Sequence, residues 1–170
     1  RAKHSRVLGY AISSNADSVS AMSSKEIDEI KSNFSALSLR ESSIADLLKK
    51  RVNCDIHVDL DPTLLLNKSL WQPITKTSKG SKKDYMITYH LPGRYKALGR
   101  NDFMSRAKVI AERQNLELID LSSFKYSVSD FVSLISNASL VLTSSFHATV
   151  FSVIFNRPLI ALQLNDGYDS

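Results

Sequence analysis

Short apolar runs alternate with helix-like stretches along almost the whole chain, and this alternation constrains the fold more than any other feature of the sequence. The runs expected to form strands lie at 6–12, 36–39, 55–60, 85–91, 116–121, 140–142 and 158–164, and the run at 140–142 is expected to be buried. The stretches expected to form helices lie at 25–32, 43–51, 63–66, 102–115, 130–136 and 146–155. Strands that alternate with helices form parallel sheets joined by right-handed crossovers. The sequence therefore predicts an α/β protein with Rossmann-like parallel sheets flanked by helices.

Polar residues ahead of several helix-like stretches predict where those helices begin. Ser23 and Glu26 have the spacing of a capping box, and a second pair at 43 and 46 (Ser and Asp) has the same spacing. Ser129 is expected to cap the helix at 130–136. Residues 13–21 are rich in serine and are expected to form a loop.

One stretch without apolar periodicity, residues 71–83, divides the alternation into two blocks. We expect residues 1–72 to form the C-terminal part of a first Rossmann-like lobe, residues 73–83 to be a linker, and residues 84–170 to form a second lobe. Trp71 is expected to anchor one end of the linker. The chain begins with Arg1 rather than Met, which indicates a fragment of a longer protein.

The composition, 43% hydrophobic and 23% charged, is that of a soluble globular protein, and no apolar run is long enough to cross a membrane. The single Cys54 excludes an intrachain disulfide and a zinc site with several cysteines. The net charge of +5 comes partly from lysines at 76, 79, 82 and 83. We interpret them as a solvated linker, with an anionic membrane surface or an acidic substrate as the alternative. They lack the interleaved aromatic residues of a nucleic-acid site, so no nucleic-acid partner is expected.

The stretch 139–155 carries the strongest chemical signal. An apolar strand is followed by Thr143, Ser144 and Ser145, and then by a nearly all-apolar helix with His147 in its first turn. A helix start offers backbone N–H groups and a positive dipole end to an anion. The alternative is structural, because Ser and Thr are ordinary helix caps and a His in an apolar sequence is commonly a hydrogen-bonded core residue.

The carboxyl ends of other strands carry further candidates. Arg40, His90 and the stretch 143–147 all follow expected strands, and ligands of parallel sheets bind at such ends. The sequence thus predicts a cleft between two lobes. The alternative for Arg40 is an ion pair with Glu41 or Asp46. The acidic pair at 59 and 61 could bind a metal, but the Pro at 62 favours a turn and cap.

Six segments occur in order at a suitable spacing, namely SLRE at 38–41, DPTLL at 61–65, YMITY at 85–89, SNA at 136–138, TSSFH at 143–147 and FSVIFNRP at 151–158. Together they resemble the polysaccharide pyruvyl transferase family, over most of the chain. The resemblance implies a two-lobed fold like that of GT-B glycosyltransferases, of which this chain would be a fragment. It implies transfer of a pyruvyl group from phosphoenolpyruvate to two hydroxyls of a sugar, which forms a pyruvate ketal in extracellular polysaccharide or cell-wall glycan synthesis.

The family motifs assign function to Arg40 and His147. The chain departs from the pattern at Ala148, where a Gly usually follows the His, and in its length, because family members are usually much longer. Phosphoenolpyruvate carries two anionic groups, so we expect Arg40 to bind one of them and the helix start with Ser144 and Ser145 to bind the other.

His147 is expected to act as general acid or as phosphate partner, and to meet Arg40 across the cleft. Thr143, Phe146 and His90 complete the expected substrate site. We expect neither a metal nor a cofactor, since phosphoenolpyruvate enters as a donor substrate.

Two other function classes stay open. A sugar-nucleotide glycosyltransferase has the same two-lobed fold, although no acidic residue is well placed to bind a ribose. A non-catalytic carbohydrate-binding fragment is the other. Neither a Gly-x-Gly-x-x-Gly motif nor a Walker motif is present, which argues against a nicotinamide dehydrogenase and a P-loop nucleotidase. The expected acceptor is a sugar or a lipid-linked oligosaccharide, and the expected location is the cytoplasm, with peripheral association at the inner face of the membrane.

Overall fold

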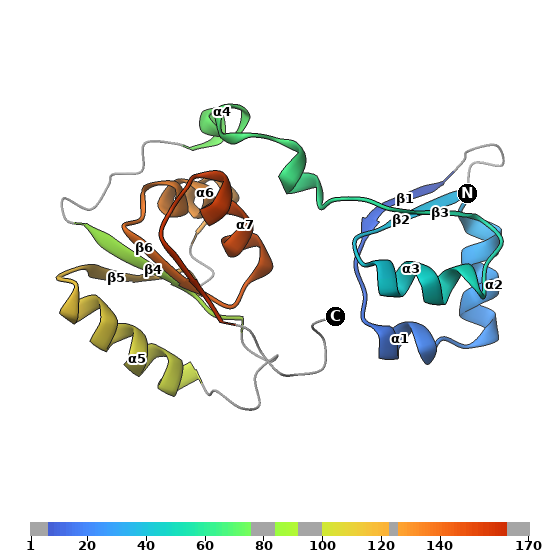
Figure 1. Ribbon diagram of the computed structural model, residues 1–170, viewed down its shortest axis with the longest axis horizontal. Coiled ribbons are helices and arrows are strands. Elements are labelled where there is room, and N and C mark those ends of the chain that lie inside the picture. The colour runs from blue at the N-terminus through green and yellow to red at the C-terminus, as the bar shows by residue number, and fades with distance from the viewer. Residues whose placement is uncertain (1–6, 76–83, 92–99, 123–125, 163–170) are drawn as a thin grey trace. The chain divides into compact units, whose positions relative to one another are not determined.

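The computed structural model describes residues 7–75, 84–91, 100–122 and 126–162, which belong to two units (Figure 1). Leu65 ends the main part of the first unit and Leu66 begins the second. The lysine-rich part of the expected linker, residues 76–83, lies outside the described residues. The α/β fold class with parallel sheets and flanking helices is confirmed in both units.

The first unit contains a parallel sheet of three strands in the order β1-β2-β3, with β1 at Leu8–Ile12, β2 at Ala36–Leu39 and β3 at Asp55–Val58. Its helices are α1 (Ala16–Ser20), α2 (Ser24–Asn33) and α3 (Ser42–Lys49), followed by a 3₁₀ turn η1 (Pro62–Leu65). The three α-helices lie on one face of the sheet in Figure 1. Its core consists of Val19, Ile27, Leu39, Ile44, Ala45, Leu48 and Val52.

The second unit contains a parallel sheet in the order β5-β4-β6-β7, with β4 at Tyr85–Tyr89, β5 at Glu117–Asp120, β6 at Leu140–Thr143 and β7 at Leu159–Ala161. A short helix α4 (Lys68–Trp71) and a 3₁₀ turn η2 (Gln72–Ile74) precede it. The remaining helices are α5 (Arg100–Arg113), α6 (Val128–Asn137) and α7 (Phe146–Ile154).

Helices cover both faces of this second sheet. Met86 and Ile87 are adjacent in β4 and fully buried, and they belong to two different apolar clusters because successive side chains of a strand point to opposite faces. Met86 packs with α5, and Ile87 packs with α6 and α7. Trp71 anchors its segment as expected, with its ring edge against Phe151 at a centroid distance of 4.9 Å.

Three local expectations are wrong, and all three concern where a helix begins. Residues 16–20 form a helix rather than a loop, because the Asn15 side chain accepts a hydrogen bond from the Ser18 N–H and Val19 is buried beneath. Helix α3 begins at Ser42 after Glu41, with no side-chain cap, so the capping box expected at 43 and 46 is not formed.

Helix α6 begins two residues earlier than expected, because Ser127 rather than Ser129 is its cap. Ser127 Oγ accepts from the Asp130 N–H at 3.2 Å, and Asp130 Oδ2 accepts from the Ser127 N–H at 3.0 Å. The capping box expected at Ser23 and Glu26 is confirmed. Among the described residues, no helix is both long enough and apolar enough to cross a membrane.

The Ser127 cap gives a direct test of the α6 boundary. Ser127→Ala should lower the free energy of unfolding by about 1 kcal/mol, because it removes the hydroxyl that accepts from the Asp130 N–H and donates to Asp130 Oδ2, while the backbone half of the capping box remains. Ser105→Ala is the matched control, since the exposed Ser105 hydroxyl donates only to the Asn101 carbonyl of its own helix. Urea unfolding followed by circular dichroism compares them, and an equal loss in both variants would contradict the assignment.

Candidate functional site

The order of the strands in the second unit defines where a ligand can bind. From β4 the chain passes through α5 to β5 on one side, and then through α6 to β6 on the other side of β4. The two crossovers lie on opposite faces of the sheet, so the carboxyl ends of β4 and β6 flank the point where the strand order reverses. In parallel α/β sheets this reversal leaves the crevice in which ligands bind. His90 follows β4 and Ser144 follows β6.

The turn between β6 and α7 is held by hydrogen bonds from buried hydroxyl residues. Thr143 is fully buried; its Oγ1 donates to the Tyr89 carbonyl at 2.7 Å and accepts from the Ser145 N–H at 2.9 Å. Ser145 is 4% exposed, and its carbonyl accepts the first hydrogen bond of α7 from Thr149. The Thr143 side chain and the Ser145 backbone therefore shape the turn, and direct substrate contact by either residue stays a prediction.

The first turn of α7 carries two exposed side chains, Phe146 and His147. Its N-cap residue, Ser145, makes no capping hydrogen bond with its side chain. The N–H groups of a first turn have no intrahelical acceptor, and with the helix dipole they favour an anion. Phe146 is 50% exposed and His147 is also exposed, with the two rings edge to face at 5.3 Å. The structure thus places His147 on the surface of the helix start, not in the core.

His90 is buried, at 2% exposure, directly beside this turn. Its ring stacks on Phe103 with centroids 4.6 Å apart, and its Nδ1 lies 3.3 Å from Ser144 Oγ. The Ser122 hydroxyl accepts from the His90 N–H and donates to the His90 carbonyl, which fixes the backbone after β4. The imidazole can thus set the orientation of the half-buried Ser144 hydroxyl.

Arg40 follows β2 in the first unit and forms an ion pair with Asp61. The sequence offers Glu41 or Asp46 as the alternative ion-pair partner of Arg40 and assigns Asp61 to a turn, so the observed partner differs from both. Asp61 also makes that turn, since its Oδ1 accepts from the Thr63 N–H at 3.0 Å and from the Thr63 hydroxyl at 2.6 Å.

The environment of Asp61 favours its charged form. Burial raises the pKa of the carboxyl group, but the hydrogen bonds from Thr63 and the Arg40 guanidinium outweigh burial and leave the pKa below its ordinary value of 3.8. A charged carboxylate at this position orients Arg40 at the carboxyl end of β2.

The structure brings together six of the seven residues that the sequence assigned to the site, at the carboxyl ends of β4 and β6 and the start of α7. Arg40 belongs to the other unit, so its meeting with His147 stays a prediction. Sequence analysis missed Phe103, Ser122 and the ion-pair role of Asp61. Only the position of Asp61 after a strand could have indicated its role. Within the described ranges, no three His, Cys, Asp or Glu side chains cluster as metal ligands.

The family model for polysaccharide pyruvyl transferase matches residues 1–166, nearly the whole chain. No curated protein and no solved structure matches significantly.

The Asp61 ion pair predicts a pH-dependent contribution to stability. Because the pKa of Asp61 is lower in the folded protein than in the unfolded chain, its charged form stabilises the fold at pH values above the unfolded-state pKa, near 3.8. This stabilisation is lost as the pH falls through the folded-state pKa. Asp61→Asn should therefore cost about 1–2 kcal/mol at pH 7, with the difference from the parent chain shrinking below pH 4. The matched control is Asp59→Asn, at an exposed position. Urea unfolding between pH 7 and 3 tests this, and a cost that does not depend on pH would contradict it.

Burial separates the two histidines of the site in their reactivity. Diethyl pyrocarbonate should modify the exposed His147 rapidly and leave the buried His90 intact in the folded chain. Peptide mass spectrometry after brief exposure measures both sites, with the exposed His57 of β3 as an internal reference. Modification of His90 at the rate of His57 would show that the imidazole is accessible.

Proposed function

The chain belongs to the polysaccharide pyruvyl transferase family, and from that premise we propose that it transfers the pyruvyl group of phosphoenolpyruvate to two hydroxyl groups of one sugar, forming a cyclic pyruvate ketal. The observation that best supports this reaction is the exposed His147 in the first turn of α7, at the point where the strand order reverses. An imidazole beside an anion-binding helix start suits a reaction that protonates a phosphorylated enol.

The proposed reaction adds one proton and two sugar oxygens to the donor. The C3 methylene carbon takes up a proton and becomes a methyl group, and one sugar hydroxyl oxygen bonds to C2. The C2–O bond to phosphate then breaks, phosphate leaves with its bonding electrons, and the second sugar hydroxyl bonds to C2. The two hydroxyl protons are released. The site must therefore bind a carboxylate and a phosphate, deliver a proton and stabilise the leaving phosphate.

Each of these tasks has a candidate group. The backbone N–H groups at the start of α7, with Ser144, suit one anionic group of the donor. The Arg40 guanidinium suits the other, because its planar fork binds carboxylate or phosphate through two hydrogen bonds. His147 is proposed as the proton donor, since an imidazole exchanges protons near neutral pH.

The remaining predicted residues act mainly through these groups. His90 is proposed to orient the Ser144 hydroxyl, from 3.3 Å away, and Asp61 to orient Arg40. Thr143 and Ser145 hold the turn that exposes Phe146 and His147. His90 and Asp61 are therefore positioning residues in this proposal.

The acceptor in the proposal is a sugar of a polysaccharide or of a lipid-linked oligosaccharide. Phosphoenolpyruvate is a cytoplasmic metabolite, so we propose that the reaction takes place in the cytoplasm, at the inner face of the membrane where the acceptor is lipid-linked. The proposed reaction thus has two substrates, the phosphoenolpyruvate donor and the sugar acceptor.

Binding of phosphoenolpyruvate tests the donor. Titration calorimetry should show binding to the parent chain and to His57→Ala, whose imidazole is exposed in β3, but much weaker binding to His147→Ala and Arg40→Gln. Uridine diphosphate should not compete. Preferential binding of uridine diphosphate would instead identify a sugar-nucleotide glycosyltransferase, and binding of a neutral oligosaccharide alone would identify a carbohydrate-binding fragment.

Turnover tests the role of His147 in proton transfer. His147→Gln keeps a hydrogen-bonding side chain but cannot deliver a proton near neutral pH, so ketal formation should fall by about 10²–10⁴-fold. Thermal unfolding of the variant should match that of the parent chain, because His147 is exposed. Full turnover by a folded His147→Gln variant would remove His147 from the mechanism.

A further inference from the structure

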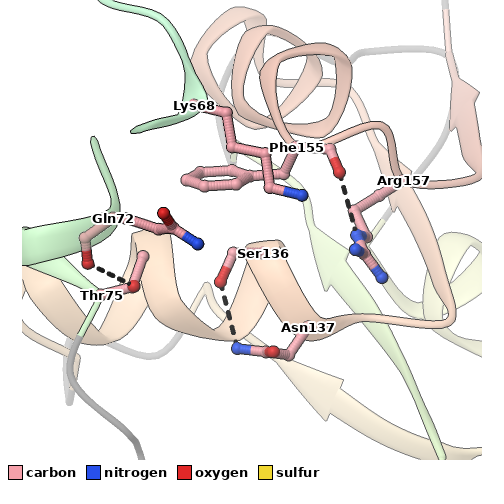
Figure 2. A pocket seen from close by; sticks show the side chains of 7 residues that line it. All are labelled: Lys68, Gln72, Thr75, Ser136, Asn137, Phe155 and Arg157. Carbon is pink, nitrogen blue, oxygen red and sulfur yellow. Dashed lines mark hydrogen bonds between the residues drawn. The ribbon is translucent and has the colours of Figure 1, made fainter. Parts of the chain in front are cut away.

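A polar pocket opens in the second unit, away from the start of α7 (Figure 2). It has a volume of about 240 Å³ and lies where α6 and α7 end, at the amino edge of the sheet. Six of its lining residues are polar: Lys68, Gln72, Thr75, Ser136, Asn137 and Arg157. The seventh is the buried Phe155. The proposed transfer reaction uses none of these residues.

Two cations face the pocket without a carboxylate to neutralise them. None of its described lining residues is acidic. Arg157 donates from Nε to the Phe155 carbonyl at 3.2 Å, and within the described residues its two terminal nitrogens and the Lys68 amine make no hydrogen bond or ion pair. Figure 2 shows both side chains extending toward the same open space, together with those of Gln72 and Ser136. The pocket therefore favours an anion.

The carboxyl-terminal ends of α6 and α7 determine how much negative charge the pocket favours. The carbonyl ends of α6 and α7 each carry about half a negative charge, which offsets about half of the two cationic charges. The remaining potential suits one negative charge better than two. A carboxylate carries one charge at neutral pH, whereas a phosphate monoester carries nearly two.

The neutral lining groups suit hydroxyls. The side-chain amide of Gln72 and the Oδ1 of Asn137 make no hydrogen bond within the described residues, whereas Asn137 Nδ2 donates to the Ser133 carbonyl at 2.9 Å. An amide can both donate to and accept from a hydroxyl group. The pocket thus combines a site for a single anion with amides that can bind the hydroxyls of a sugar.

We propose that this pocket binds an acidic sugar through its carboxylate, with Lys68 and Arg157 holding the carboxylate and Gln72 and Asn137 holding ring hydroxyls. The single charge follows from the pocket, whereas the choice of a sugar rests on the proposed function. Two residues of an acidic polysaccharide share this chemistry, a uronic acid and a sugar that already carries a pyruvate ketal. The pocket would hold such a residue away from the transfer site.

The test uses the full chain labelled with ¹⁵N, without phosphoenolpyruvate. Methyl glucuronide and the 4,6-pyruvate ketal of methyl galactoside should shift the amide signals of Ser136, Asn137 and Arg157, whereas neutral methyl glucoside should not. Lys68→Gln and Arg157→Gln should each weaken binding by at least about tenfold, because each removes a charge-assisted hydrogen bond. Lys108→Gln, at an exposed position on α5, is the control.

The outcomes separate this proposal from the proposed reaction. Lys68→Gln should leave phosphoenolpyruvate binding unchanged, and His147→Ala should leave acidic-sugar binding unchanged. Whichever of the two acidic sugars binds more tightly identifies the source of the carboxylate. Tighter binding of glucose 6-phosphate, equal binding of the neutral glucoside, failure of both acidic sugars to bind, or full binding by Lys68→Gln would overturn the proposal. Arg157→Lys, which keeps the charge, controls for the lost helix-end contact to Phe155.

Discussion

The reversal of strand order around β4 is the constraint on which the second unit depends. Helices α5 and α6 cross the sheet on opposite faces. The segments that follow β4 and β6 therefore diverge to opposite faces and leave a crevice between the carboxyl ends of the two strands. Hydrogen bonds connect these two strand ends, since Thr143 Oγ1 reaches back to the Tyr89 carbonyl and Ser144 Oγ reaches the His90 ring. These contacts hold the turn between β6 and α7, and His147 lies exposed in the helical turn that follows.

The apolar runs were sufficient to predict the position of every strand among the described residues, including β1 and β3, where apolar side chains such as Leu8 and Val58 are exposed. The apolar pattern failed at helix starts, where a single hydrogen bond decides. Ser127 and Ser129 lie two residues apart and are equally good caps by composition, but only Ser127 forms the reciprocal pair with Asp130. Residues 16–20 have a single buried apolar residue, Val19, so the helix there depends on Asn15 rather than on any periodic pattern.

The candidate site also contains features that the sequence predicts and features that it does not. The residues within 143–147 could be predicted together because they are adjacent in sequence. The pairing of His90 with Ser144 spans 54 positions, and that of Arg40 with Asp61 spans 21. Such pairs depend on which strands are neighbours. The sequence indicates that a residue lies at a strand end, but the strand order, and with it the partner, is a property of the folded sheet.

Helix α7 has two ends of opposite partial charge, and the chain places different chemistry at each. Its start favours anions through N–H groups and carries His147, which suits a donor with both a carboxylate and a phosphate. Its end presents carbonyl groups, and Arg157 donates to one of them, so part of the cationic charge in the nearby pocket is already offset. In the two proposals, one helix dipole favours the more highly charged donor at its start and a singly charged sugar at its end.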